Sequence, residues 1–168
     1  MTVFMYEASV APFRARLKSL RHVLAKGEAN AAERKIDPAV FLQGRLAPDM
    51  LPLVSQVRIA SDHAKGATLR LSGRAPVPFS DDEVTFADLR QRIDRTVSLL
   101  DDFSPKEFER SEDRDITMRL GGRDFAFKGL RYLLDFAQPN FYFHVTTAYD
   151  ILRHNGVPLG KPDFFVEG

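Results

Sequence analysis

The 168-residue sequence contains no cysteine. This absence excludes disulfide bonds, thiolate nucleophiles and metal sites built on cysteine ligands. A chain without cysteine also fits a reducing compartment. The first residues, MTVFMYEASVAPFRARLK, lack the basic start and the continuous apolar stretch of a secretory signal peptide. The sequence therefore predicts a cytoplasmic protein.

A charge excess and long apolar runs are missing as well. The chain carries 24 Lys and Arg against 23 Asp and Glu, a formal net charge of +1. No basic cluster stands out that would attract nucleic acid or an anionic membrane surface. No apolar run approaches the roughly 20 residues that a membrane-spanning helix needs. We therefore expect neither nucleic acid nor a membrane among the partners.

Several catalytic motifs are also absent. The sequence has no glycine-rich phosphate loop and no Gly-x-Ser-x-Gly nucleophile elbow. It has no Glu-x-x-His pair of the di-iron bundles, and no His-x-x-x-His pair. The four histidines and the carboxylates are then the remaining candidates for chemistry.

The residues that are present indicate one globular domain over residues 1–168, with 44% hydrophobic and 28% charged residues. Apolar residues recur at spacings of three and four in several segments, a pattern typical of amphipathic helices. The segments are Thr2–Lys26, Pro48–Ser72, Thr85–Phe103 and Phe127–Asn155. Such helices with little strand content predict an all-α bundle.

Glycine and proline mark the predicted ends and irregularities of these helices. Gly27 and Gly73 are the expected stops of the first and second helices. Pro12 should kink or split the first helix, because proline lacks the N–H that continues the helical hydrogen bonding. Pro139 should bend the fourth helix or loosen its turn near Asp135.

Capping signals support two further boundaries. Thr85 is a good N-cap for the third helix, and Asp88, three residues later, completes a looser form of the capping box. Gly156 followed by Pro158 predicts the end of the fourth helix.

The segment DITMRLGGRDFAFKG, between the third and fourth helices, has strand character. Apolar and polar residues alternate on both sides of Gly121-Gly122, whose freedom to adopt positive φ suits a tight turn. This predicts a short β-hairpin. Elsewhere we expect a short helix at Pro38–Gln43, and a tail over residues 157–168 that packs as an irregular arm or covers a partner subunit.

Polar residues in two of the helices predict a shared pocket. Beside the apolar seam of the second helix, polar residues repeat every seven positions and form one strip. They are Asp49, Gln56, His63 and Arg70. On the fourth helix, Asn140 lies one turn before His144 on the same face. If these two helices are neighbours, the two polar groups converge inside the bundle. The pocket would hold Gln56, His63, Asn140 and His144, with Asp49 as a further candidate.

Two interpretations of this cluster stay open. A buried network of Asn, Gln and His side chains can satisfy its own hydrogen bonds and rigidify the core, with no further role. Alternatively, the cluster is a metal or catalytic site. His22 and His154 fit structural or surface positions better, since His154 lies in the last helical turn, where the helix dipole favours a cation.

Two stretches carry a distinctive pattern: RLAPDMLPLVSQVRIASDHAKG at Arg45–Gly66, and PNFYFHVTTAYDILRHNGVPLGK at Pro139–Lys161, which follows the Gly-Gly hairpin. In these motifs, and over nearly its whole length, the chain resembles a bacterial family of DinB-like proteins of unknown function. The resemblance implies a DinB/YfiT-like four-helix bundle with a small β-hairpin between helices 3 and 4. Members of this superfamily are often homodimers.

The resemblance also implies a metal site. Many members of the superfamily bind a divalent metal, nickel or zinc, through one histidine of the second helix and a His-x-x-x-His motif of the fourth. His63 matches the first of these, and His144 matches the second histidine of the motif. Asn140 stands where the motif has its other histidine, and an amide oxygen is a weaker ligand for these metals than imidazole. Gln56, Asp49 or Asp62 would supply a further oxygen ligand.

Two functions remain as hypotheses. Characterised relatives in the superfamily include thiol-dependent transferases, so the resemblance implies a divalent-metal-dependent enzyme of the thiol-transferase type. Its thiol would come from the substrate, because the chain has no cysteine. The alternative is a non-catalytic dimeric bundle, or a small-molecule binder, with a structural His/Asn/Gln cluster.

Overall fold

The structure is a computed structural model that describes residues 2–165. The chain is mostly helical and carries one small antiparallel hairpin, as predicted. The longer helices are α1 (Thr2–Glu33), α3 (Leu53–Ser72), α4 (Phe86–Asp101) and α6 (Gln138–His154). Short elements are α2 (Pro38–Leu42), η1 (Pro105–Phe108), η2 (Ser111–Asp113), α5 (Gly129–Arg131), the π-helix η3 (Tyr132–Ala137) and η4 (Lys161–Phe165). The strands are β1 (Asp115–Leu120) and β2 (Arg123–Lys128).

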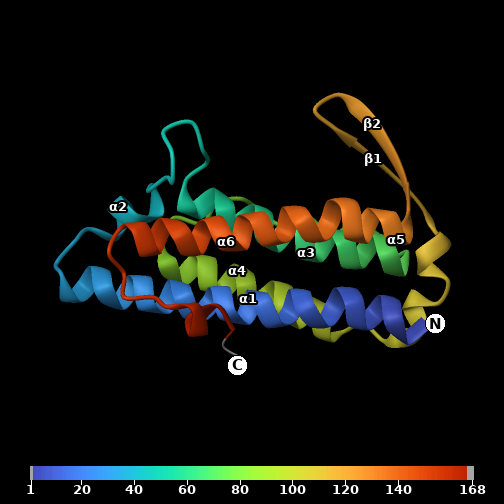
Figure 1. Ribbon diagram of the computed structural model, residues 1–168, viewed down its shortest axis with the longest axis horizontal. Coiled ribbons are helices and arrows are strands. Elements are labelled where there is room, and N and C mark those ends of the chain that lie inside the picture. Colours follow the sequence, from blue (N-terminus) through green and yellow to red (C-terminus); the bar gives the residue numbers. More distant parts are fainter. Residues whose placement is uncertain (1, 166–168) are drawn as a thin grey trace.

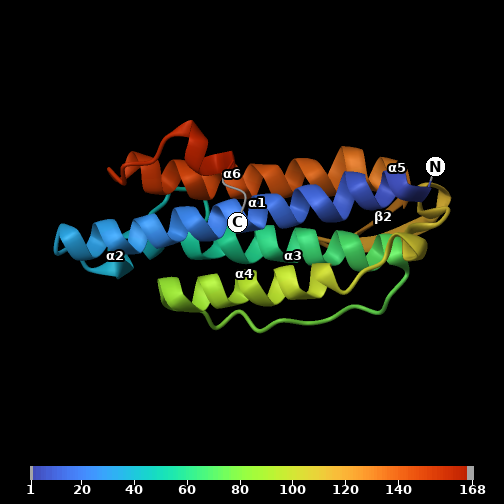
Figure 2. The same ribbon diagram turned by 90° about the horizontal axis from the view of Figure 1, so that it is seen from below.

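The long helices α1, α3, α4 and α6 lie side by side (Figures 1 and 2). Helix α3 packs against α6 and α4, and α1 packs against α4 and α6. Residues 73–85 run back along α4, so that α3 and α4 point in the same direction (Figure 2). The apolar faces form one core that includes Phe13, Leu17, Val57, Ala60, Ala64, Leu89, Ile93, Phe141 and Ala148. In the described part of the chain, no helix is long and apolar enough to cross a membrane.

Helix α1 differs from its prediction at the expected stop. It continues through Gly27 to Glu33, so the predicted stop is wrong. A Cβ on Gly27 would lie 3.0 Å from the side chain of Leu152 and 3.3 Å from that of Phe86. This glycine is therefore a point of close helix packing. Pro12 lies inside a single helix, which is not split there.

Helix α3 begins at Leu53, five residues later than the predicted Pro48, because Pro52 occupies its N-cap in an extended conformation. It ends at Gly73 as predicted, with a left-handed φ of 79°. The capping box of α4 is confirmed: the backbone N–H of Asp88 donates to Thr85 Oγ1 at 3.1 Å, and the Asp88 carboxylate accepts from the Thr85 N–H at 2.9 Å.

The predicted fourth helix starts later than expected, because β2 extends to Lys128. It consists of three consecutive pieces, α5, η3 and α6. The loosened turn near Asp135 is confirmed as the π-helix η3. Proline has no N–H, and the ring of Pro139 crowds the carbonyl of Asp135, so the preceding turn widens. Helix α6 ends at His154, and Gly156 follows with a φ of 89°.

The remaining expectations concern short elements. The hairpin is confirmed, with φ of 55° and 80° at Gly121 and Gly122, and it projects from the helices (Figure 1). Helix α2 is confirmed at Pro38–Leu42. The tail packs on α1 up to residue 165, where Asp163 accepts hydrogen bonds from His22 and Lys26. Residues 166–168 lie outside the described part.

Candidate functional site

The polar residues predicted to meet come from α3 and α6, which pack directly against each other. His144 Nδ1 lies 2.7 Å from Gln56 Oε1, across the two helices. The rings of His63 and His144 are nearly parallel, at an angle of 15°, with centroids 5.8 Å apart. The structure thus brings Gln56, His63 and His144 into one cluster.

The position of Gln56 defines the tautomer of His144. The Gln56 amide nitrogen donates to the backbone carbonyl of Leu51 at 3.0 Å, and the side chain is buried. Its other atom, Oε1, therefore faces His144 as an acceptor. The imidazole must then donate from Nδ1, and its neutral form carries a free lone pair on Nε2.

Both imidazoles are neutral at pH 7. Burial lowers the pKa of His63 from 6.5 to about 4, and the neighbouring His144 and the cationic Arg70 lower it further, against the opposite effect of Asp62. Burial also lowers the pKa of His144. Neutral imidazole is the form that accepts a proton or binds a metal.

Two other predicted residues are placed differently. Asn140 lies on α6, one turn before His144, but its amide nitrogen donates to the carbonyl of Phe136 at 2.7 Å, so the amide is bonded to its own helix. Asp49 is exposed in the turn before α3 and is not part of the helical strip. His22 is paired with Asp163, and His154 is exposed.

A cavity of about 180 Å³ opens beside His63. Its walls come from α3, the hairpin and η3, and consist of Ile59, Asp62, His63, Arg70, Met118, Leu120 and Phe136. The ring of Phe136 lies 5.9 Å from that of His63. Sequence reasoning missed Phe136 and Met118. The only hint was the expected loosened turn, which moves Phe136 out of helical register.

The distance between the two histidine rings is compatible with a metal ion between them. Two imidazoles that share an ion at roughly 2.0–2.1 Å per Zn–N bond have ring centroids roughly 5–6.5 Å apart. The observed 5.8 Å between His63 and His144 lies in that range. Within residues 2–165, no three His, Asp or Glu side chains gather to hold a metal. The nearest carboxylate on α3, Asp62, pairs with Lys65 at 2.8 Å and with Arg92 at 3.0 Å.

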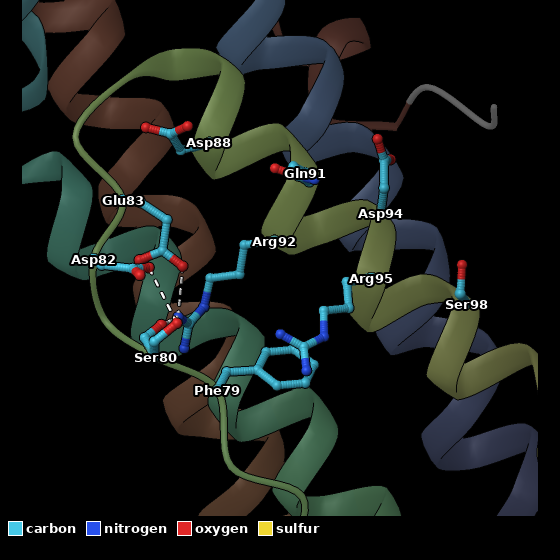
Figure 3. A pocket seen from close by; sticks show the side chains of 10 residues that line it. All are labelled: Phe79, Ser80, Asp82, Glu83, Asp88, Gln91, Arg92, Asp94, Arg95 and Ser98. Carbon is cyan, nitrogen blue, oxygen red and sulfur yellow. Dashed lines mark hydrogen bonds and ion pairs between the residues drawn. The ribbon is translucent and has the colours of Figure 1, made fainter.

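A second and larger hollow, of about 640 Å³, lies between α4 and the preceding segment (Figure 3). At its floor the buried guanidinium of Arg92 contacts Glu83 at 2.8 Å and the carbonyl of Ser80 at 2.8 Å. Asp81 pairs with the same guanidinium at 3.0 Å, and Arg58 pairs with Glu83 at 2.7 Å. These charges neutralise one another and fix residues 80–83 to α3 and α4.

The ring of Phe79 is surrounded by cations in the same region. The nitrogen of Lys65 lies 3.9 Å from the ring centroid, and the guanidinium carbon of Arg95 lies 4.0 Å from it. Cation–π contacts of this kind attach an extended segment to neighbouring helices. The charged and aromatic residues around the larger hollow therefore have a structural role, which is to attach this segment to α3 and α4. The histidine pair is the better candidate for a functional site.

The fold is that of a DinB-like helical protein. A family model described as a domain of unknown function, DUF1993, matches residues 5–165, and the chain belongs to this family. Its structure is similar to that of a DinB family member protein from Shewanella denitrificans, with a TM-score of 0.91 and 40% sequence identity. The match covers 99% of this chain and 94% of that one. None of the curated proteins searched matches this chain.

Proposed function

We propose that this chain is a four-helix bundle of the DinB/YfiT type that binds a divalent metal, nickel or zinc, through His63 and His144, and acts on a small molecule. The observation that carries the proposal is the hydrogen bond between Gln56 and His144. It leaves the Nε2 lone pair of His144 free beside a second neutral imidazole. Metal-binding histidines usually have their other ring nitrogen held in this way by a carbonyl or carboxylate.

The proposed chemistry is of the thiol-transferase type. A bound divalent metal would polarise a thiol or water and lower its pKa. Gln56 orients His144, and the rings of Phe136 and His63 form one wall beside the reacting groups. The thiol belongs to the substrate, since the chain has no cysteine. Asn140, one turn before His144, would supply an amide oxygen after rotation away from its bond to Phe136.

Elemental analysis and calorimetric titration of untagged protein with nickel and zinc test this proposal. We expect one equivalent of metal, lost in both His63→Ala and His144→Ala and retained in His154→Ala, which removes an exposed histidine from the far end of α6. Absence of binding in the intact protein would contradict it. Where metal binds, thiol-transfer assays follow.

A second candidate function is a non-catalytic small-molecule binder with a structural histidine cluster. The bond from Asn140 to Phe136 favours it, because it ties the amide nitrogen to its own helix and so restrains the orientation of the amide oxygen. Catalytic zinc sites generally have three protein ligands. Asn140→His tests the point: if metal binds only after this substitution, the natural chain is a binder and the cluster is structural.

The homodimer that the resemblance implies is also part of the proposal. Three large apolar side chains on α6, η3 and the hairpin are exposed: Phe143 by 54%, Leu134 by 42% and Phe125 by 37%. Light scattering coupled to size exclusion should give twice the mass of one chain. The mass of a single chain at every concentration would contradict the dimer.

A further inference from the structure

The cavity beside His63 shares lining residues with a second one along α3. The second cavity measures about 220 Å³ and includes Lys65, Gly66, Arg74 and Val77. Asp62 and Arg70 line both cavities. A ligand beside His63 would therefore lie next to Arg70.

Arg70 differs from the other cations of this surface in having no carboxylate partner. Lys65 pairs with Asp62 at 2.8 Å, and Arg74 holds Glu107 at 2.6 Å. Within residues 2–165, Arg70 forms no ion pair, and it donates one hydrogen bond, to the hydroxyl of Tyr132 at 3.1 Å. Most of its donors are thus free to bind an anion.

Arg70 is exposed, and its guanidinium lies over Gly66 and next to Tyr132. A Cβ on residue 66 would lie 2.6 Å from Arg70 Nη1, so the side chain folds back over the glycine. Glycine is costly in the middle of a helix, and this close approach explains its position there. Burial raises the pKa of Tyr132, so its hydroxyl remains protonated at neutral pH.

The rest of the cavity beside His63 is largely apolar. Phe136, Met118 and Leu120 face it from η3 and β1. The one carboxylate at the rim, Asp62, is paired with Lys65 and Arg92 and repels an anion less for that reason. The volume of about 180 Å³ is below the roughly 300–1,000 Å³ of sites for drug-sized ligands.

We propose that this cavity binds a small organic carboxylate, whose charged group contacts Arg70 and whose apolar body lies against Phe136, next to His63. A planar carboxylate matches the fork of one guanidinium, whereas a phosphate generally recruits several cations. The inference rests on the proposed function, since it names the class of molecule that the same site admits.

The test uses phenylacetate and 3-phenylpropionate as probes, each beside its neutral amide, with the imidazole NMR signals of His63 and His144 as readout. We expect saturable shifts with the carboxylates and weak or no shifts with the amides. Equal affinity for acid and amide, or no saturable shift with either carboxylate, would overturn the proposal.

Variants separate the role of Arg70 from folding. Arg70→Gln should weaken carboxylate binding by roughly tenfold to a hundredfold, the usual effect of losing a charged hydrogen bond. Gly66→Ala keeps the charge but displaces the guanidinium, and it should weaken binding while the helix becomes more stable. Arg153→Gln, on the exposed end of α6, is the matched control and should bind as the natural protein does. Undiminished binding in Arg70→Gln would refute the assignment.

The two proposals fail independently. Titration of metal into the same samples shows whether the histidine pair binds nickel or zinc. Carboxylate binding without metal binding would support the Arg70 site and contradict the proposed metal site. Metal binding without any preference for carboxylates would support the metal site and contradict the Arg70 site.

Discussion

Two polar clusters include residues of α3, and they differ in how densely their groups are paired. Around Arg92, the carboxylates of Asp62, Asp81 and Glu83 surround one buried guanidinium. Around His144, a single hydrogen bond to Gln56 orients the ring and leaves the second nitrogen free. Several ion pairs around one buried charge suit a structural joint, whereas a free and oriented lone pair is what binding or catalysis requires.

The burial of the two clusters fits this difference. The side chain of Arg92 is only 2% exposed, and a buried charge is stable there only while its partners remain. His63 and His144 are half-buried, and His63 lines a cavity. Substitutions should therefore damage folding at the first cluster and binding at the second.

The largest effect is expected from Arg92→Met. Loss of the guanidinium leaves the buried Glu83 and its neighbours without their main partner, and unfolding free energy should fall by about 3–5 kcal/mol. Denaturant unfolding measures it. The control is Arg95→Met on the same helix, whose exposed side chain contacts Phe79 and should cost less than about 1 kcal/mol. Equal effects of the two would remove the contrast between the clusters.

The next effect is a pH dependence from His63. Its pKa is about 4 in the folded chain, against 6.5 for a free histidine. Between these values the unfolded chain binds a proton that the folded chain does not, so stability falls as pH falls. We expect a loss of about 2 kcal/mol between pH 7.5 and pH 5. His63→Gln should flatten this part of the profile, measured by denaturant unfolding at each pH, and an unchanged profile would mean that His63 is not buried as a neutral ring.

His144→Ala should have a smaller effect on stability, about 1–2 kcal/mol, because it leaves the buried Oε1 of Gln56 without a donor. A double variant with Gln56→Leu should recover part of this loss, since both polar partners are then gone. Thermal or denaturant unfolding of the three variants forms the cycle. Strict additivity of the two substitutions would show that the bond between Gln56 and His144 does not form.

The smallest effect, and one of opposite sign, is expected from Gly66→Ala. Alanine is favoured over glycine in a helix interior by up to about 1 kcal/mol, and the only atom in the way belongs to the flexible end of Arg70. Unfolding free energy should rise slightly. A decrease would mean that Arg70 cannot move, and that Gly66 is needed for folding.

Local signals in the sequence predicted much of the fold. The capping box at Thr85, the stop at Gly73 and the hairpin turn at Gly121-Gly122 depend on neighbours within a few residues, and all are confirmed. Gly27 was misinterpreted because its role depends on Leu152 and Phe86, which are distant in the sequence.

The same distinction applies to the candidate site. Seven-residue spacing placed Gln56 and His63 on one strip, and packing of α3 on α6 then brought them to His144. The spacing could not show that Asn140 bonds to Phe136 of its own helix. Nor could it show that the hairpin residues Met118 and Leu120 line the cavity beside His63. The position of Phe136 in that cavity depends on the widened turn of η3.

The most direct test of the account is the nitrogen NMR spectrum of protein labelled at histidine, before and after one equivalent of zinc. Before zinc, we expect His144 as the neutral tautomer with its proton on Nδ1, and His63 neutral down to about pH 5. With zinc, the signals of both rings should move together and saturate at one ion per chain. A proton on Nε2 of His144, or rings that do not respond to zinc, would contradict the proposed metal site.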